Sequence, residues 1–445
     1  MILTILLLLS VLLISIEAQK HFKIPSPITL IVLSYLFYYS FPNMILFSEG
    51  DFANLVLFLI PILMTADALH LKLEDLKENA FSLFYLAVFS VSISIGVGIL
   101  ISDTLFGQYA LSTGAVIALF AMVLATDPVS VVSVFSSFKV SHKLKILAEG
   151  ESLFNDATAL IVFAFIAIPM INGADIGAGD IAIVSIKVLT LSVAIGLMVG
   201  FMGIGLMRLT QDSMSEFVII LLTAYASFEI AEIFHLAGLL AVIVAIITLN
   251  SITQKSFEAK ERQVEKARRI VYNTNKNRKR FSFGFMNRVT NKLKSDITDI
   301  ERHKQNVNYV GVLAILANTF LFVSMASIVH IDALIKYSTE ILLMFGVTTL
   351  IRATMMGSFA FISNSVGSMQ DISLRWWSVL LFAGIKGGLS IVMLQMLPDG
   401  FAHQEMFEAI VMGVILLSTI IYAMVLVGII LKNKSAFDEE YALHQ

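Results

Sequence analysis

The chain has 445 residues, of which 58% are hydrophobic and 14% are charged, and its formal net charge at pH 7 is -3. Soluble domains carry roughly 25% charged residues, so the composition excludes an ordinary soluble protein and makes a lipid bilayer the solvent for most of the chain. The sequence has no cysteine, which excludes disulfides, thiolate metal sites and cysteine nucleophiles.

Apolar stretches of about 17 to 25 residues, long enough to cross a bilayer, recur along the sequence. The first stretch lacks a basic N-terminal segment and a small-residue cleavage site, so we expect a retained helix rather than a cleaved signal peptide. The predicted fold is an all-α polytopic membrane protein with a transmembrane domain over residues 1–432. Its thirteen predicted spans are residues 2–18, 24–45, 52–70, 80–101, 109–138, 148–171, 181–206, 216–233, 236–250, 307–330, 338–362, 375–397 and 405–431.

The basic residues are distributed unevenly between the two sides of these spans. The connections after odd-numbered spans, together with the C-terminal tail, hold 26 of the 30 Lys and Arg residues, whereas the opposite side holds only Lys336. Cytoplasmic connections are enriched in Lys and Arg. The sequence therefore predicts a protein of the plasma (inner) membrane with its N-terminus outside and its C-terminus in the cytoplasm.

Two segments outside the spans are polar: the connection 251–308 and the C-terminal tail 433–445. The basic run 276–280 in the connection is followed by interleaved phenylalanines. Because the connection joins two membrane spans, we expect a solvated cytoplasmic loop near anionic headgroups and no nucleic-acid partner. A regulatory role for this loop is the alternative.

The fifth predicted span contains the sequence Ala125-Thr126-Asp127-Pro128. Pro128 has no N–H group to donate to the helix ladder and disfavours helical geometry at the preceding residue. We therefore expect a local break that frees backbone carbonyls and leaves Asp127 facing a cavity, because broken backbone inside a bilayer must be satisfied by protein or water. A simple proline kink, capped by Asp127, is the alternative and is compatible with ion binding.

The sixth predicted span carries Ser152, Asn155 and Asp156 at helical spacing, so the three side chains fall on one face. Together with Asp127 and a freed carbonyl at Thr126, they form a set of hard oxygen ligands that suits a small cation. The set has no soft sulfur or imidazole ligand, which argues against zinc or copper. Ionisable groups inside a membrane are costly, so two carboxylates in this set indicate a functional site.

Three further charges fall inside predicted spans. Glu151 points away from the face of Asp156, and we expect it to form a structural ion pair with Arg352 of the eleventh span. Lys386 of the twelfth span is surrounded by glycines, which predicts a second broken helix. The two breaks become equivalent if spans 1–6 and 8–13 are inverted repeats, a common arrangement in transporters.

Three of these motifs resemble the signature of NhaP-type sodium/proton antiporters, in the sodium/hydrogen exchanger family of the cation/proton antiporter superfamily. The motifs are Thr126-Asp127-Pro128, Gly150-Glu151-Ser152 with Asn155-Asp156, and Gly384-Ile385-Lys386-Gly387-Gly388-Leu389-Ser390. The resemblance implies that Asp127 and Asp156 bind Na+, that Ser152 and the Thr126 carbonyl are further ligands, and that Glu151 and Arg352 form an intramembrane salt bridge.

The resemblance also implies an overall organisation and an activity. It implies a homodimer with a moving core, spans 80–171 and 338–431, and a dimer scaffold, spans 2–70 and 216–330. It implies exchange of Na+ or Li+ for H+ by alternating access, without enzymatic activity or a cofactor, in pH homeostasis and sodium tolerance. The pair Asn155-Asp156, with asparagine in place of a second aspartate, is similar to the electroneutral branch of the family, which exchanges one cation for one proton. Two positions depart from the pattern of the family. Lys386 stands where the family usually has an arginine, and Asp67 lies one residue after the position at which some relatives have a glutamate.

Other functions remain open at the level of the sequence. Ligand types alone do not separate sodium from potassium, so K+/H+ exchange is the main alternative. A cation-coupled symporter, a cation channel and a transport-dead sensor are less favoured, because the clustered polar groups suit a bare ion and no ring-forming filter is evident. The GxGD string at 177–180 is typical of intramembrane aspartyl proteases, but it falls in a predicted outer loop without a Tyr-Asp partner.

Overall fold

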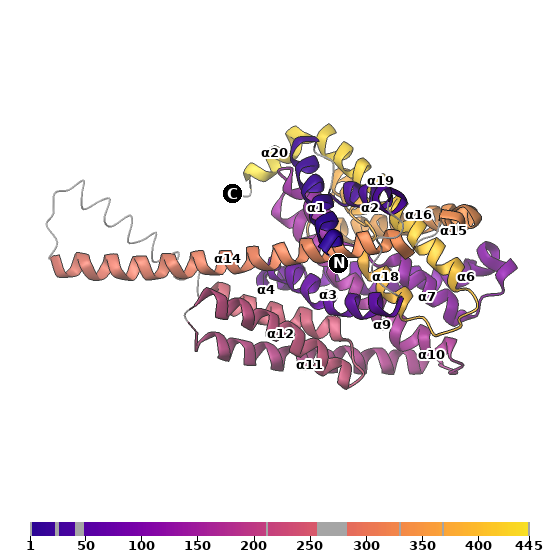
Figure 1. Ribbon diagram of the computed structural model, residues 1–445, viewed down its shortest axis with the longest axis horizontal. Helices are drawn as coiled ribbons and strands as arrows, with labels where there is room; N and C mark the ends of the chain where they lie inside the picture. The colour runs from indigo at the N-terminus through magenta and orange to yellow at the C-terminus, as the bar shows by residue number, and fades with distance from the viewer. Residues whose placement is uncertain are drawn as a thin grey trace. The chain divides into compact units, whose positions relative to one another are not determined.

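A computed structural model of the chain describes residues 2–22, 26–40, 49–210, 212–255, 283–328, 331–366 and 369–443. This part of the chain is almost entirely helical (Figure 1). Its first half contains α1 (Ile2–Phe22), α2 (Ser26–Ser40), α3 (Glu49–His70), α4 (Leu73–Glu78), α5 (Ala80–Phe84), α6 (Ser90–Phe106), α7 (Thr113–Leu124), α8 (Pro128–Ser136), α9 (His142–Val162), α10 (Ile168–Ile171), α11 (Ala178–Met207) and α12 (Ser213–Ile233). Its second half contains the helix Gly238–Lys255, α14 (Phe283–Ile328), α15 (Ile331–Lys336), α16 (Ser338–Ser365), α17 (Leu374–Phe382), α18 (Gly388–Gln395), α19 (Gln404–Lys432) and α20 (Lys434–Leu443).

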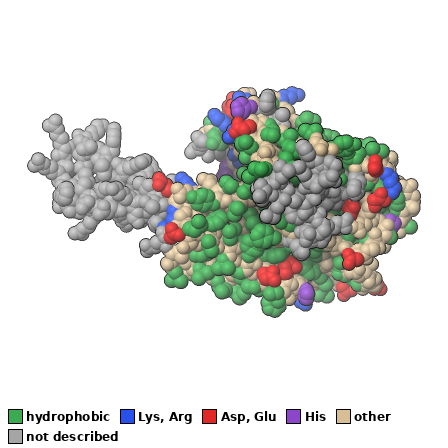
Figure 2. All heavy atoms as spheres, in the orientation of Figure 1, with side chains coloured by type: hydrophobic (Ala, Val, Ile, Leu, Met, Phe, Trp, Pro, Cys, Tyr) green, Lys and Arg blue, Asp and Glu red, His purple; other side chains and the backbone are tan. Residues whose placement is uncertain are grey.

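Within the described residues, eight helices are long and apolar enough to cross a membrane: Ala80–Tyr109, His142–Ile171, Gly179–Met207, Ser213–Ile233, Gly238–Lys255, Glu301–Val323, Ser338–Ser365 and Gln404–Lys432. Hydrophobic side chains cover much of the molecular face in Figure 2. Each of the thirteen predicted spans contains a described helix. The all-α polytopic fold is therefore confirmed, while the number of crossings stays a prediction.

The helix that contains the tenth predicted span is longer than the span itself. The tenth span was expected to start at residue 307, but α14 already begins at Phe283. The residues before 307 are mostly polar, and a search for apolar runs does not detect the helical segment that they form. Residues 256–282, including the basic run 276–280, lie outside the described residues.

The chain divides into two compact units. The first consists of Met1–Leu63, Glu74–Leu191 and Ile315–Gln445, and the second of Met64–Leu73 and Ser192–Ala314. Both predicted core ranges, 80–171 and 338–431, fall in the first unit. The predicted division into a moving core and a dimer scaffold stays a prediction.

The second unit is packed through small residues on α11. A side chain added at Gly196 or Gly200 would meet the helix Gly238–Lys255, and one at Gly203 would meet Thr223 of α12. The backbones therefore approach closely, which is how helices associate where lipid removes the hydrophobic drive between them. Figure 1 shows α11 and α12 side by side.

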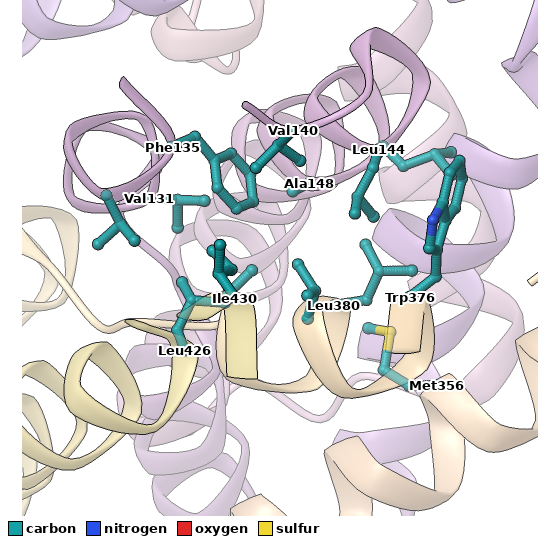
Figure 3. Packing of buried hydrophobic residues seen from close by; sticks show 14 of the residues in the cluster. Val131, Phe135, Val140, Leu144, Ala148, Met356, Trp376, Leu380, Leu426 and Ile430 are labelled. Atoms are coloured by element: carbon teal, nitrogen blue, oxygen red, sulfur yellow. The ribbon is translucent and has the colours of Figure 1, made fainter. Parts of the chain in front are cut away.

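The first unit has a hydrophobic cluster built from segments far apart in the sequence (Figure 3). It joins Val131 and Phe135 of α8 to Trp376 of α17 and Leu426 of α19. Phe437 of α20 belongs to the same cluster and is only 1% exposed. The predicted polar tail is therefore a helix that packs onto the bundle.

Candidate functional site

The fifth predicted span is broken, as its proline indicated. The first half, α7, begins after Ser112, whose hydroxyl caps it by accepting the Ala115 N–H at 3.2 Å. Its helical pattern ends at Leu124, and α8 starts again at Pro128. Proline suits the first position of a helix, because the missing N–H would have no helical partner there.

The twelfth predicted span is also broken, between α17 and α18, and the two breaks meet. The Asp127 N–H donates to the Ile385 carbonyl at 2.7 Å, and the Ser390 hydroxyl donates to the Met122 carbonyl at 2.7 Å. A methyl group at Gly387 would overlap the Asp127 side chain. The absence of a side chain at Gly387 therefore allows the second break to approach the first. Through this approach, backbone groups of each broken helix bind residues of the other.

The side chains predicted from α9 converge on the first break. The Thr126 N–H donates to Asp156 Oδ1 at 2.8 Å, and the Ser152 hydroxyl donates to Thr126 Oγ1 at 2.8 Å. The Asn155 amide donates to the Leu124 carbonyl at 3.0 Å and to Thr126 Oγ1 at 3.3 Å. Thr126 thus binds the α9 side chains through its N–H and its hydroxyl. No hydrogen bond to its carbonyl is found in the described residues.

These groups are buried, and one of them has unused binding capacity. Asp127, Asp156 and Asn155 are 7%, 2% and 3% exposed. The side-chain oxygen of Asn155, Oδ1, is buried and has no hydrogen-bond partner within the described residues. An unsatisfied buried oxygen is costly and requires an explanation, for which a bound cation is the simplest candidate.

Ser130 is a residue of this site that the sequence reasoning missed. Its hydroxyl donates to Asp127 Oδ2, and the residue is fully buried. A serine three residues after an aspartate at a helix start is a common capping arrangement, and this spacing is the signal that could have identified it.

Lys386 reaches from the second break to the first. Its ammonium group donates to the Leu124 carbonyl at 3.2 Å, the same carbonyl that accepts from Asn155, and its own N–H donates to Ser418 at 3.2 Å. Lys386 is 3% exposed. The Lys386 ammonium group therefore lies at the first break, at the carbonyl with which α7 ends.

Glu151 and Arg352 form a separate, closed arrangement. The guanidinium group donates to both carboxylate oxygens, at 2.9 and 2.8 Å, and also to the carbonyls of Leu380 and Leu381, at 2.9 and 3.0 Å. These carbonyls belong to the last turn of α17, which has no further helical N–H groups to satisfy them. Arg352 therefore balances Glu151 and caps the broken helix.

Asp67, the acidic residue of the third predicted span, is also buried. It belongs to the second unit, in the segment Met64–Leu73, and it is 9% exposed.

Two interrupted helices that meet inside a bundle of membrane-length helices, with carboxylates and free backbone at the meeting point, define a class of secondary transporters. The comparisons with known proteins agree. The family model for the sodium/hydrogen exchanger transmembrane domain matches residues 5–275, and the chain belongs to this family.

Several curated proteins and one solved structure are similar to the chain. The Na(+)/H(+) antiporter NhaG of Bacillus atrophaeus is 28% identical over 386 residues, or 84% of this chain and 63% of that protein. The Na(+)/H(+) antiporter NhaH of Halobacillus aidingensis is 24% identical over 96% of both chains. The sodium proton antiporter MjNhaP1 of Methanocaldococcus jannaschii matches with a TM-score of 0.71 and 18% identity, over 94% of this chain and 97% of that chain, which shows a shared fold. The chain spans slightly less than two thirds of the length of NhaG.

Proposed function

We propose that the protein exchanges Na+ or Li+ for H+ across the membrane by alternating access, with the cation and the proton competing for Asp156 and Asp127. The observation that carries the proposal is the convergence of two buried carboxylates with the unpartnered Asn155 oxygen at the crossing of two broken helices. The relatives named above are sodium/proton antiporters, which agrees with this assignment.

Competition at one site couples the two ions without a second proton site. When Na+ is bound, Asp127, Asp156, Asn155 and Ser152 supply oxygen ligands, and the carboxylates remain charged. When a proton binds Asp156 instead, the carboxylate loses its negative charge and the cation loses its strongest ligand. The site then crosses between the two faces only when one of the two ions neutralises it, because a net charge at membrane depth is costly.

A count of charges supports exchange of one cation for one proton. Glu151 and Arg352 cancel each other. Lys386, whose ammonium group lies at the Leu124 carbonyl of the same break, balances one of the two site carboxylates in this count when it is protonated. One negative charge is left, and either one Na+ or one H+ balances it. The loaded site then carries the same charge in both directions, so the exchange is electroneutral. In proteoliposomes, an imposed membrane potential should leave the exchange rate unchanged, and a rate that follows the potential would contradict this stoichiometry.

Proton movement in everted vesicles tests the exchange itself. Vesicles from a host without its own antiporters receive Na+, Li+ and K+ in turn, and the wild type is compared with Asp156→Asn. We expect Na+ and Li+ to collapse the pH gradient in the wild type only, with equal amounts of folded protein in both samples. A response to K+ alone would establish the K+/H+ alternative. No response to any cation would favour a symporter or a sensor.

We further propose that the protein is a homodimer in the plasma membrane, with its N-terminus outside, that serves pH homeostasis and sodium tolerance. The distribution of Lys and Arg supports the orientation. The molar mass of the purified protein in detergent tests the dimer, and growth of an antiporter-deficient host in high sodium tests the physiological role. Growth equal to that of the empty host, with folded protein in the membrane, would contradict the role.

A further inference from the structure

The helix α9 carries a second feature besides the site: a stripe of polar side chains along one face. His142, Lys145, Glu149, Ser152 and Asp156 are spaced by three and four residues alternately, so they lie above one another on the helix. Their burial increases toward the site: the side chain of His142 is 64% exposed, Lys145 and Glu149 are half-buried, and Ser152 and Asp156 are 0% and 2% exposed. The stripe therefore runs from the surface to the site.

The opposite side of α9 is apolar over its first two turns, before Glu151 and Asn155. Leu144, Leu147 and Ala148 are at most 1% exposed and belong to the hydrophobic cluster of Figure 3. The polar stripe is thus confined to the face that carries Asp156. A polar face whose residues become more buried from the surface inward is the arrangement expected for the wall of an aqueous path.

Glu149 is the residue of the stripe that packing does not explain. Within the described residues, its carboxylate takes part in no hydrogen bond and no ion pair, although it is half-buried. The ammonium group of Lys145, one turn earlier on the same face, attracts this carboxylate without forming an ion pair with it. His142, by contrast, is paired with Asp75 at 3.3 Å. Glu149 therefore lacks the direct contacts to both carboxylate oxygens that Arg352 makes with Glu151.

We infer that the α9 stripe lines an access path to the site and that Glu149 binds the incoming monovalent cation before it reaches Asp156. The inference rests on the proposed function and adds a second cation site to it. Seven residues separate Glu149 from Asp156, or about 10 Å along the helix. At this distance the Glu149 carboxylate attracts the cation toward the site without sharing it with Asp156.

The absence of native cysteine allows a direct test of the path. Glu149→Cys and Ala148→Cys differ by one position on the helix, and each carries the only thiol of its protein. A membrane-impermeant methanethiosulfonate reagent is applied to everted vesicles, which expose the face that we propose to be cytoplasmic. We expect the thiol at position 149 to be modified and the thiol at position 148, which lies in the hydrophobic cluster, to stay unmodified. Equal reactivity of the two thiols would overturn the proposed path.

Transport kinetics test the role of the carboxylate. Glu149→Gln should raise the KM for Na+ between about twofold and fifteenfold, the range for one charge at this distance in water-like and protein-like surroundings, and leave kcat unchanged. Lys145→Gln should lower the KM, because it removes a repelling charge. Both effects should shrink when choline chloride raises the ionic strength. An unchanged KM in Glu149→Gln would refute the cation site.

The two experiments also separate this inference from the proposed function. Thiol modification requires a folded protein but no transport. If the wild type exchanged no cation, the proposed function would fail, while the modification pattern would still decide whether the stripe lines a path.

Discussion

Two polar clusters on α9 lie five residues apart and are built in opposite ways. Around Glu151, both carboxylate oxygens accept hydrogen bonds from Arg352, and two further guanidinium donors bind two carbonyls of α17. Around Asp156, the Asn155 oxygen is left without a partner in the described residues. Both clusters are buried, so burial alone does not separate them.

The difference shows how to distinguish a structural charge from a functional one. Removing a charged group from water is costly, and the closed cluster offsets this cost with its own donors and acceptors. In the function proposed above, the open cluster keeps its oxygen ligands for an ion that arrives from outside. We expect substitutions in the closed cluster to change stability first and substitutions in the open cluster to change transport first.

The largest effect should come from breaking the closed pair. Arg352→Gln leaves the Glu151 carboxylate buried and unpaired, and loss of one partner of such a pair costs about 3–5 kcal/mol. We expect a strongly lowered thermal unfolding temperature in detergent. The double variant with Glu151→Gln should recover most of the loss, because no uncompensated charge remains. A double variant as unstable as the single one would show that the carbonyl contacts of Arg352 matter more than the pair.

The two glycines of the second break should separate stability from transport. A methyl group at Gly384 would overlap the Arg352 guanidinium, and one at Gly387 would overlap Asp127. Overpacking of this kind costs about 1–3 kcal/mol. We expect Gly384→Ala to lower the unfolding temperature more, and Gly387→Ala to lower the exchange rate more in vesicles with matched protein content. If one of the two variants were the more impaired in both unfolding temperature and exchange rate, the distinction between the clusters would be removed.

A smaller effect on transport is expected at Asn155, together with a loss of stability because its amide also donates to the Leu124 carbonyl and to Thr126 Oγ1. Asn155→Ala removes the unpartnered oxygen and should raise the KM for Na+ about tenfold, which corresponds to about 1.4 kcal/mol of binding free energy. The matched control is Asn364→Ala, since Asn364 accepts from the Ile372 N–H at 2.6 Å and donates to the Ile372 carbonyl at 3.0 Å. The control should lower stability without changing the KM. An equal KM for Asn155→Ala and the wild type would exclude the oxygen as a ligand.

The smallest effect should come from the start of α7, which belongs to neither cluster. Ser112→Ala removes the cap on the Ala115 N–H and should cost about 1 kcal/mol. The unfolding temperature should fall slightly, and the cation dependence of exchange should be that of the wild type. A changed cation dependence would show that any weakening of the broken helix reaches the site, which would weaken the interpretation of the other variants.

Much of the fold could be predicted from the sequence, because its signals are local. Apolar runs located the helices, and Pro128 and the glycines around Lys386 located the two breaks. Helical spacing correctly grouped Ser152, Asn155 and Asp156 on one face. These features follow from the period of the helix and from the chemistry of single residues.

The contacts between distant segments could not be predicted in the same way. Nothing local indicates that Arg352 caps the end of α17 or that Lys386 binds the Leu124 carbonyl, since backbone groups are identical at every position. The docking of α20 was missed for a similar reason. Glu440 accepts from Arg375 at 2.8 Å and from the Trp376 ring nitrogen at 3.0 Å, and these partners lie more than sixty residues earlier.

The hydrophobic cluster that holds α8 against α17 also has a consequence for the order of synthesis. Val131 is made early, Trp376 and Leu426 follow late, and Phe437 comes after the last membrane-length helix. Chains fold from the N-terminal end as they leave the ribosome. The cluster around the second half of the first broken helix is therefore completed only when α20 emerges. Until then, a nascent chain on the ribosome lacks part of the packing around its candidate ion site.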